Sequence, residues 1–183
     1  KELTALQRDE IATFGRVTTR VEEDFSGAQG FLLEHWHLED ESAQGLKMAR
    51  RAGNPGKRMA HGQLVGVRPA DGKNFQLGQV RWLMQGDAGD LHAGVRLLTG
   101  APTAVAIRAT GVNVSLDEKY VQALAPGGVA ALGVAPTLVL PVGWFKPKRV
   151  IQVFFDKPTR VRLNALVERG VDFERVAFDQ QPD

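Results

Sequence analysis

Residues 75–83 read Phe-Gln-Leu-Gly-Gln-Val-Arg-Trp-Leu, a run in which apolar and polar side chains follow each other at a period close to two. Successive side chains of a strand point to opposite faces, so this run predicts a strand with one buried face. Turn-forming residues stand on both sides of it: Pro-Ala-Asp-Gly at 69–72 and Gly-Asp-Ala-Gly-Asp at 86–90. The segment is therefore expected to be one strand of an antiparallel β structure.

Further runs of the same kind occur at regular spacing on both sides of this strand, with few helical patterns between them. Such spacing is typical of an antiparallel sandwich or barrel. The run Val150–Phe155 is too apolar to form an open sheet edge, so we expect it to be buried against other strands. Residues 168–170 are expected to form a loop. The other predicted strands are residues 31–38, 62–68, 92–98, 105–108, 137–141, 159–163 and 173–178.

The composition changes to Ala, Gly and Pro between residues 111 and 135, which places a module boundary near residue 111. Residues 1–111 are expected to form a small antiparallel β-barrel preceded by a short amphipathic helix within residues 1–12. Residues 112–183 are expected to form a second β-rich module. Because about 70 residues are marginal for independent folding, this module should pack on the first.

Charge and composition exclude several classes of protein. The net charge of +2 on 183 residues is too small for general DNA or RNA binding, which depends on neutralising phosphates. No apolar run approaches the ~18 residues of a membrane-spanning helix, so no membrane insertion is expected. The absence of cysteine excludes disulfides and thiolate sites and fits a cytoplasmic location. The chain begins at Lys1 without a leader, so we expect it to be part of a longer protein.

The sequence carries no motif for a catalytic nucleophile or a phosphate-binding loop, so no enzymatic activity and no cofactor are expected. His35, His37 and Glu39 would share one face of a strand, where two imidazoles and a carboxylate can bind a transition metal. The Pro-Val-Gly at 141–143 lacks the further histidine that a cupin-like metal site would need. A solvated polar face is therefore the favoured interpretation of these side chains.

Two short motifs suggest a ligand. Arg16 and Arg20 form an Arg-x-x-x-Arg, and Asp40, Ser42 and Gly45 form an Asp-x-Ser-x-x-Gly at the end of a predicted strand. Paired guanidinium groups can grip phosphates and contact guanine. A carboxylate can accept hydrogen bonds from guanine N–H groups, a hydroxyl can add another, and a glycine lets the backbone approach closely.

With the β runs that follow, these motifs resemble the PilZ domain family, which binds the bacterial second messenger cyclic di-GMP. The downstream runs are residues 62–67, the Gly-x-Val-x-Trp of residues 77–83, and the Gly-Val of residues 93–98. The resemblance covers about residues 14–110 and implies a six-stranded antiparallel barrel with the ligand on its outer surface. It implies that Arg16 and Arg20 hold phosphates and guanine edges.

By the same resemblance, Asp40, Ser42 and Gly45 form the facing surface of the ligand site. The implied function is a non-enzymatic cyclic di-GMP receptor, an adaptor in bacterial signalling that passes nucleotide binding on to a partner domain or protein.

Trp82 and Trp36 are expected to pack in a core. Lys47, Arg50, Arg51 and Arg58 are expected to lie in a solvated basic loop.

Two alternatives remain open at the level of sequence. Arg16 and Arg20 can instead end a helix and complement its dipole without binding anything. The barrel can be a degenerate PilZ-like module that serves protein interaction or structure. The carboxylates of Glu39 and Glu41 support this alternative, since they flank Asp40 and would repel a dianion.

Overall fold

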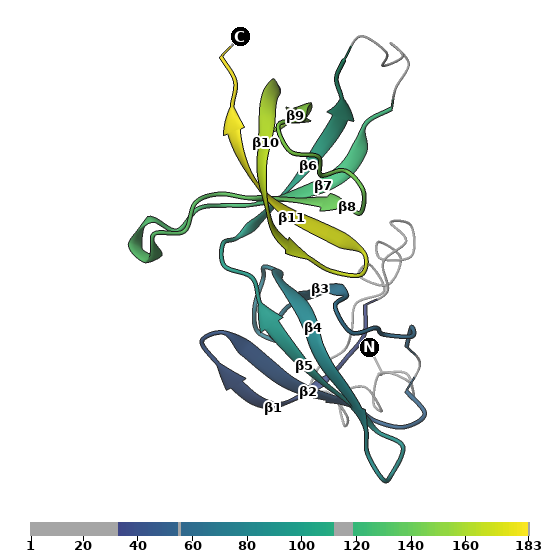
Figure 1. Ribbon diagram of the computed structural model, residues 1–183. Coiled ribbons are helices and arrows are strands. Elements are labelled where there is room, and N and C mark those ends of the chain that lie inside the picture. Colours follow the sequence, from purple (N-terminus) through teal and green to yellow (C-terminus); the bar gives the residue numbers. More distant parts are fainter. Residues whose placement is uncertain (1–32, 55, 112–118, 183) are drawn as a thin grey trace, which may run out of the picture. The chain divides into compact units, whose positions relative to one another are not determined.

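The computed structural model describes residues 33–54, 56–111 and 119–182. These residues form eleven β strands and one short 3-10 turn at Ala130–Leu132, so the prediction of a mainly β protein is confirmed (Figure 1). The predicted helix within residues 1–12 lies outside the described residues. In the part of the chain described, no helix is long and apolar enough to span a bilayer.

The first sheet has five antiparallel strands in the order β1-β2-β5-β4-β3 (Figure 1). Met48, Val80, Ala93 and Val95 lie on one side of this sheet and are buried. Lys47, Trp82 and Arg96 are more exposed and occupy the alternate positions, as expected for a sheet with one solvated face. The strands are β1 (His37–Ser42), β2 (Gly45–Arg50), β3 (Leu64–Val67), β4 (Gln76–Gln85) and β5 (Leu91–Leu97).

The second sheet is a closed antiparallel barrel in the order β10-β11-β8-β7-β6-β9, and the pairing of β9 with β10 completes the ring. Ile151 and Val153 of β9 are fully buried, and β9 pairs with strands on both sides, so this run forms no open edge, as expected. Phe154 in the same strand is 42% exposed. The strands are β6 (Pro102–Ala109), β7 (Val121–Pro126), β8 (Leu138–Pro141), β9 (Val150–Phe154), β10 (Pro158–Arg169) and β11 (Phe173–Gln180). The barrel core is Val105, Ile107, Ala123, Leu138, Leu140, Ile151, Val153, Val161, Leu163 and Val176.

The closed barrel lies later in the chain than the sequence places it. The expectation is a barrel within residues 14–110, whereas the observed barrel runs from β6 to β11 and begins at Pro102. The described strands before β6 form the five-stranded sheet instead. Alternation of apolar residues is the same in an open sheet and in a closed one. Closure depends on the long-range pairing of β6 with β9, which alternation does not reveal.

Residues 33–36 belong to the predicted strand 31–38 but form no strand, because β1 begins at His37. Three other segments form strands where none is predicted. Lys47 and Arg50 belong to β2 rather than to a loop, and Glu168 and Arg169 belong to the end of β10. Strand β7 forms inside the stretch rich in Ala, Gly and Pro, where no strand is predicted. In each case cross-strand pairing supplies hydrogen bonds and neighbours that outweigh a weak local preference.

Both sheets belong to one compact unit, His37–Ala52 with Met59–Asp183. Within it, the buried residues Leu77 and Leu98 pack with Val139 and Phe173 of the barrel. We call this cluster and the hydrogen bonds beside it the seam. In those bonds, the Asp172 carboxylate accepts from the Leu64 N–H (2.9 Å), and the Gly62 carbonyl accepts from the Val171 N–H (3.0 Å).

The other compact unit comprises Lys1–Trp36 and Gly53–Arg58. In its described part, the Glu34 carboxylate accepts hydrogen bonds from the Trp36 indole N–H (3.2 Å) and from the backbone N–H of Lys57 (2.7 Å). One carboxylate therefore ties together two segments that are separated in sequence.

Candidate ligand-binding site

The Asp-x-Ser-x-x-Gly motif forms the hairpin between β1 and β2. Ser42 is the last residue of β1 and pairs with Gly45, the first residue of β2. The Ser42 hydroxyl donates to the Gly45 carbonyl (3.3 Å) and accepts from the Gln44 N–H (3.4 Å). A Cβ at Gly45 would lie 2.9 Å from the Val95 carbonyl oxygen, so only glycine lets β2 approach β5 this closely. The motif therefore shapes the hairpin itself.

Asp40 stands at an exposed position on the same hairpin, and one of its carboxylate oxygens accepts from the Glu41 N–H (2.9 Å). The structure thus brings together Asp40, Ser42 and Gly45, as the sequence predicts for one surface. Arg16 and Arg20 lie outside the described residues, so their placement beside this hairpin stays a prediction.

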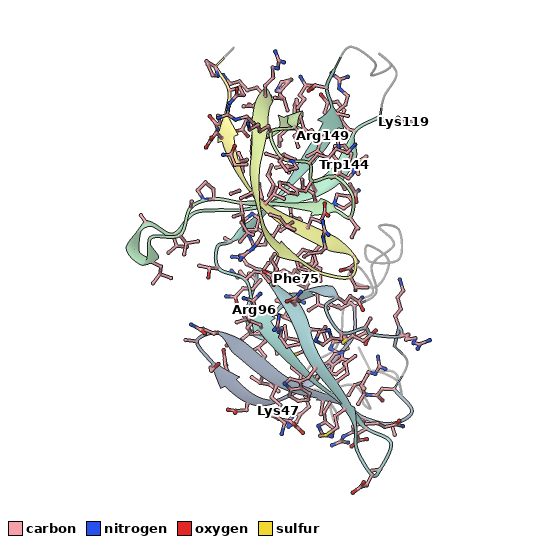
Figure 2. The ribbon with its side chains drawn as sticks, viewed as in Figure 1. Lys47, Phe75, Arg96, Lys119, Trp144 and Arg149 are labelled. Carbon is pink, nitrogen blue, oxygen red and sulfur yellow. The ribbon has the colours of Figure 1, made fainter. Side chains whose placement is uncertain are left out.

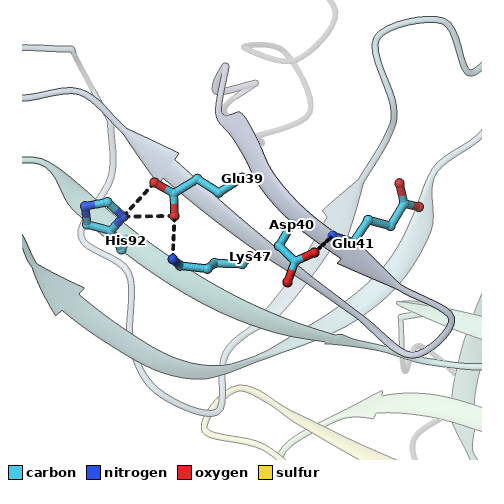
Figure 3. Close-up of polar contacts among 5 residues, drawn as sticks. All are labelled: Glu39, Asp40, Glu41, Lys47 and His92. Atoms are coloured by element: carbon cyan, nitrogen blue, oxygen red, sulfur yellow. Dashed lines mark hydrogen bonds and ion pairs between the residues drawn. The ribbon is translucent and has the colours of Figure 1, made fainter.

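The Glu39 carboxylate is engaged by Lys47 and His92. Glu39 sits at a β-bulge, where the pairing register shifts between Leu38 and Asp40. Its carboxylate contacts Lys47 Nζ at 3.1 Å and His92 Nδ1 at 3.2 Å. The Lys47 hydrogen bond, opposed by partial desolvation and helped by His92, lowers the pKa of the Glu39 carboxyl. Figure 3 shows Glu39 turned toward His92 and Lys47, and Asp40 turned toward the backbone of Glu41.

An open hollow of about 360 Å³ lies beside the hairpin, and we call it the hairpin hollow. The hairpin forms one side of it, and β4 and β5 contribute Arg81, Trp82, Gly94 and Arg96. The Trp82 indole lies across Gly94, because a Cβ added at Gly94 would collide with its ring atoms. Glycine at this position therefore gives the indole room to lie against the sheet.

Trp82 is 39% exposed, so the prediction that it packs in a core is wrong. In a regular strand, Val80 and Trp82 would share a face. The register of β4 against β5 shifts between these two residues, so Val80 pairs with Val95 and Trp82 with Gly94. The extra residue turns Trp82 to the face opposite the buried Val80. Sequence reasoning missed this residue because alternation alone does not locate a bulge.

The hairpin hollow combines three cationic side chains with two carboxylates. Lys47, Arg81 and Arg96 line it together with Asp40 and Glu41. Figure 2 labels Lys47 and Arg96 on the five-stranded sheet. The Arg81 guanidinium donates to the Gln79 side-chain oxygen at 3.0 Å, which orients it. An aromatic face beside guanidinium groups can take a planar base through stacking and a phosphate through charge-assisted hydrogen bonds.

The site offers little for metal binding. Among residues 33–54, 56–111 and 119–182, no three His, Cys, Asp or Glu side chains gather closely enough to hold a metal ion. His92, one imidazole near the site, contacts Glu39 instead.

Comparison with known proteins concerns the barrel. A family model described as the FimW C-terminal beta-barrel domain matches residues 105–181, from within β6 to just after β11. The match covers less than half of the chain. Searches of curated proteins and of solved structures found no match.

The fold and this match define the class of protein. It is a mainly β protein with a five-stranded sheet and a closed six-stranded barrel, and the barrel is similar to the FimW C-terminal beta-barrel domain. No family resemblance is predicted from the sequence of these residues. The resemblance of residues 14–110 to PilZ domains stays a prediction.

Proposed function

We propose that the protein is a non-enzymatic, cytoplasmic receptor for cyclic di-GMP that passes nucleotide binding on to a partner domain or protein. One observation carries the proposal. Asp40, Ser42 and Gly45 lie in one hairpin, and that hairpin borders a hollow that also contains cationic side chains and the exposed face of Trp82.

The chemistry of the ligand suits this surface. Cyclic di-GMP carries two phosphate charges and two guanine bases. Arg81 and Arg96 can meet a phosphate, and the exposed carboxylate of Asp40 can accept hydrogen bonds from guanine N–H groups. Pairing of Glu39 with Lys47 also offsets one of the three neighbouring carboxylates that would repel a dianion.

Isothermal titration of the full chain with cyclic di-GMP tests the proposal. We expect saturable heat, and we expect Arg16→Ala or Arg20→Ala to remove it while thermal unfolding stays unchanged. Arg162→Ala is the matched control, because Arg162 is an exposed arginine of the barrel that pairs with Asp179. The absence of both heat and thermal stabilisation at high ligand concentration would refute the proposal.

A second candidate function is protein interaction through a site that binds no nucleotide. The hydrogen bonds of Ser42 and the close approach at Gly45 favour it, because both residues have a complete structural role in the hairpin. Asp40→Ala discriminates between the two functions. A receptor would lose nucleotide affinity, whereas an interaction module would show no nucleotide-dependent signal before or after the change.

A further inference from the structure

Arg96 takes part both in the hairpin hollow and in a contact between the five-stranded sheet and the barrel. It lies in β5 (Figure 2), where it lines the hairpin hollow. Its guanidinium also forms an ion pair with Glu168 at the end of β10 in the barrel. The Arg96 side chain is 43% exposed, whereas the Glu168 side chain is 10% exposed. The arginine can therefore reach solvent and ligand, while the carboxylate stays within the protein.

The Glu168 carboxylate depends on Arg96 for its hydrogen bond. Its second carboxylate oxygen lies 3.4 Å from Arg175 Nε, and neither of these two buried atoms has a hydrogen-bond partner among the described residues. Its hydrogen bond is therefore the one with Arg96, and the charge of Arg175 supports it from the other side. A buried carboxylate that loses its hydrogen-bonded cation is penalised by desolvation.

We propose that Glu168 and a nucleotide phosphate compete for the Arg96 guanidinium. Binding in the hairpin hollow then weakens the ion pair between the five-stranded sheet and the barrel, and this ion pair in turn lowers the affinity for the nucleotide. By thermodynamic linkage, the free energy by which nucleotide binding weakens the ion pair equals the free energy by which the ion pair weakens nucleotide binding. The proposal rests on the proposed function, and it makes the barrel the element that receives the binding signal.

The rest of the seam is independent of Arg96. Leu77 and Phe173 belong to the apolar cluster, and Asp172 accepts from the backbone of Leu64. These contacts would hold the two sheets together while Arg96 changes its partner. The expected change is therefore local to the end of β10 and does not require separation of the sheets.

Isothermal titration with cyclic di-GMP on the full chain and four variants tests the competition. Glu168→Gln should bind about three- to five-fold more tightly, because a partly exposed ion pair no longer competes. Arg96→Gln should bind about ten-fold more weakly, and Glu168→Gln added to it should change nothing further. Asp172→Asn is the control, since it alters the seam without contacting Arg96, and its affinity should equal that of the wild type.

Glu168→Asp provides a second test in case Glu168→Gln does not fold. It keeps a negative charge beside Arg175 but shortens the reach to Arg96, so it should also tighten binding. If the wild type binds and both Glu168 variants bind with the same affinity as it does, the competition is refuted and the receptor function stands. If neither the wild type nor any variant gives heat, the receptor function is refuted and the competition with it.

Discussion

Replacing Phe173 with alanine should destabilise the protein strongly. Phe173 in β11 is 2% exposed and packs with Leu77, Leu98 and Val139 in the seam. A buried aromatic side chain hides about 150–250 Å² from water, and at about 25 cal/mol per Å² its transfer is worth about 4–6 kcal/mol. Because the cavity left by the ring partly collapses, the expected loss in the free energy of unfolding is about 3–5 kcal/mol.

Chemical and thermal unfolding followed by tryptophan fluorescence measure this loss, because Trp82 lies in the five-stranded sheet and Trp144 lies beside the barrel core. The melting temperature should fall by roughly 6–20 °C. Val171→Ala in the same hairpin is the control and should cost under about 0.5 kcal/mol, since its side chain is 59% exposed. A loss below about 1 kcal/mol for Phe173→Ala would show that the ring is not buried between the sheets.

Two further predictions concern carboxylates. Glu174 is 1% exposed, and its carboxylate accepts a hydrogen bond from the Phe145 N–H. Glu174→Ala should therefore lower the free energy of unfolding in urea by about 2–3 kcal/mol. An unchanged midpoint of the urea transition would contradict this. Lys47→Met should raise the pKa of Glu39 in an NMR titration, because Lys47 contributes most to lowering it. Because the pKa of Glu39 is lower in the folded protein than in the unfolded chain, ionised Glu39 stabilises the fold at pH values above its unfolded pKa. This contribution to the free energy of unfolding is lost as the pH falls through the folded pKa. A Glu39 pKa that does not respond would show that the ion pair is absent in solution.

Trp144 lies in the loop between β8 and β9 and is half-buried. Arg149 lies over the Trp144 ring at 5.1 Å and donates to the Trp144 carbonyl at 3.0 Å (Figure 2). The sequence leaves open whether Trp144 and Phe145 anchor the second module to the first or are exposed to a partner. The structure places both against the barrel core. Only the three-dimensional arrangement could decide this, because the contacts come from residues distant in sequence.

The candidate site was predictable in part. The resemblance to PilZ domains implies that Asp40, Ser42 and Gly45 form one surface. The structure places all three in one hairpin, because they are close in sequence and local turn chemistry determines their geometry. Trp82 and Arg96 could not be assigned to that surface in advance. Their positions depend on the bulge in β4 and on the pairing of β5 with both β2 and β4.

The sequence by itself determined the β class, most of the strands and that the run Val150–Phe155 forms no open sheet edge, because alternation and turn residues act over a few neighbouring positions. The tertiary structure alone decided which strands close into a barrel, the exposed face on which Trp82 lies, and the pairing of Arg96 with Glu168. Those outcomes depend on registers and contacts between segments far apart in the chain. A shift of one residue in register turns a side chain to the other face, and no local pattern records it.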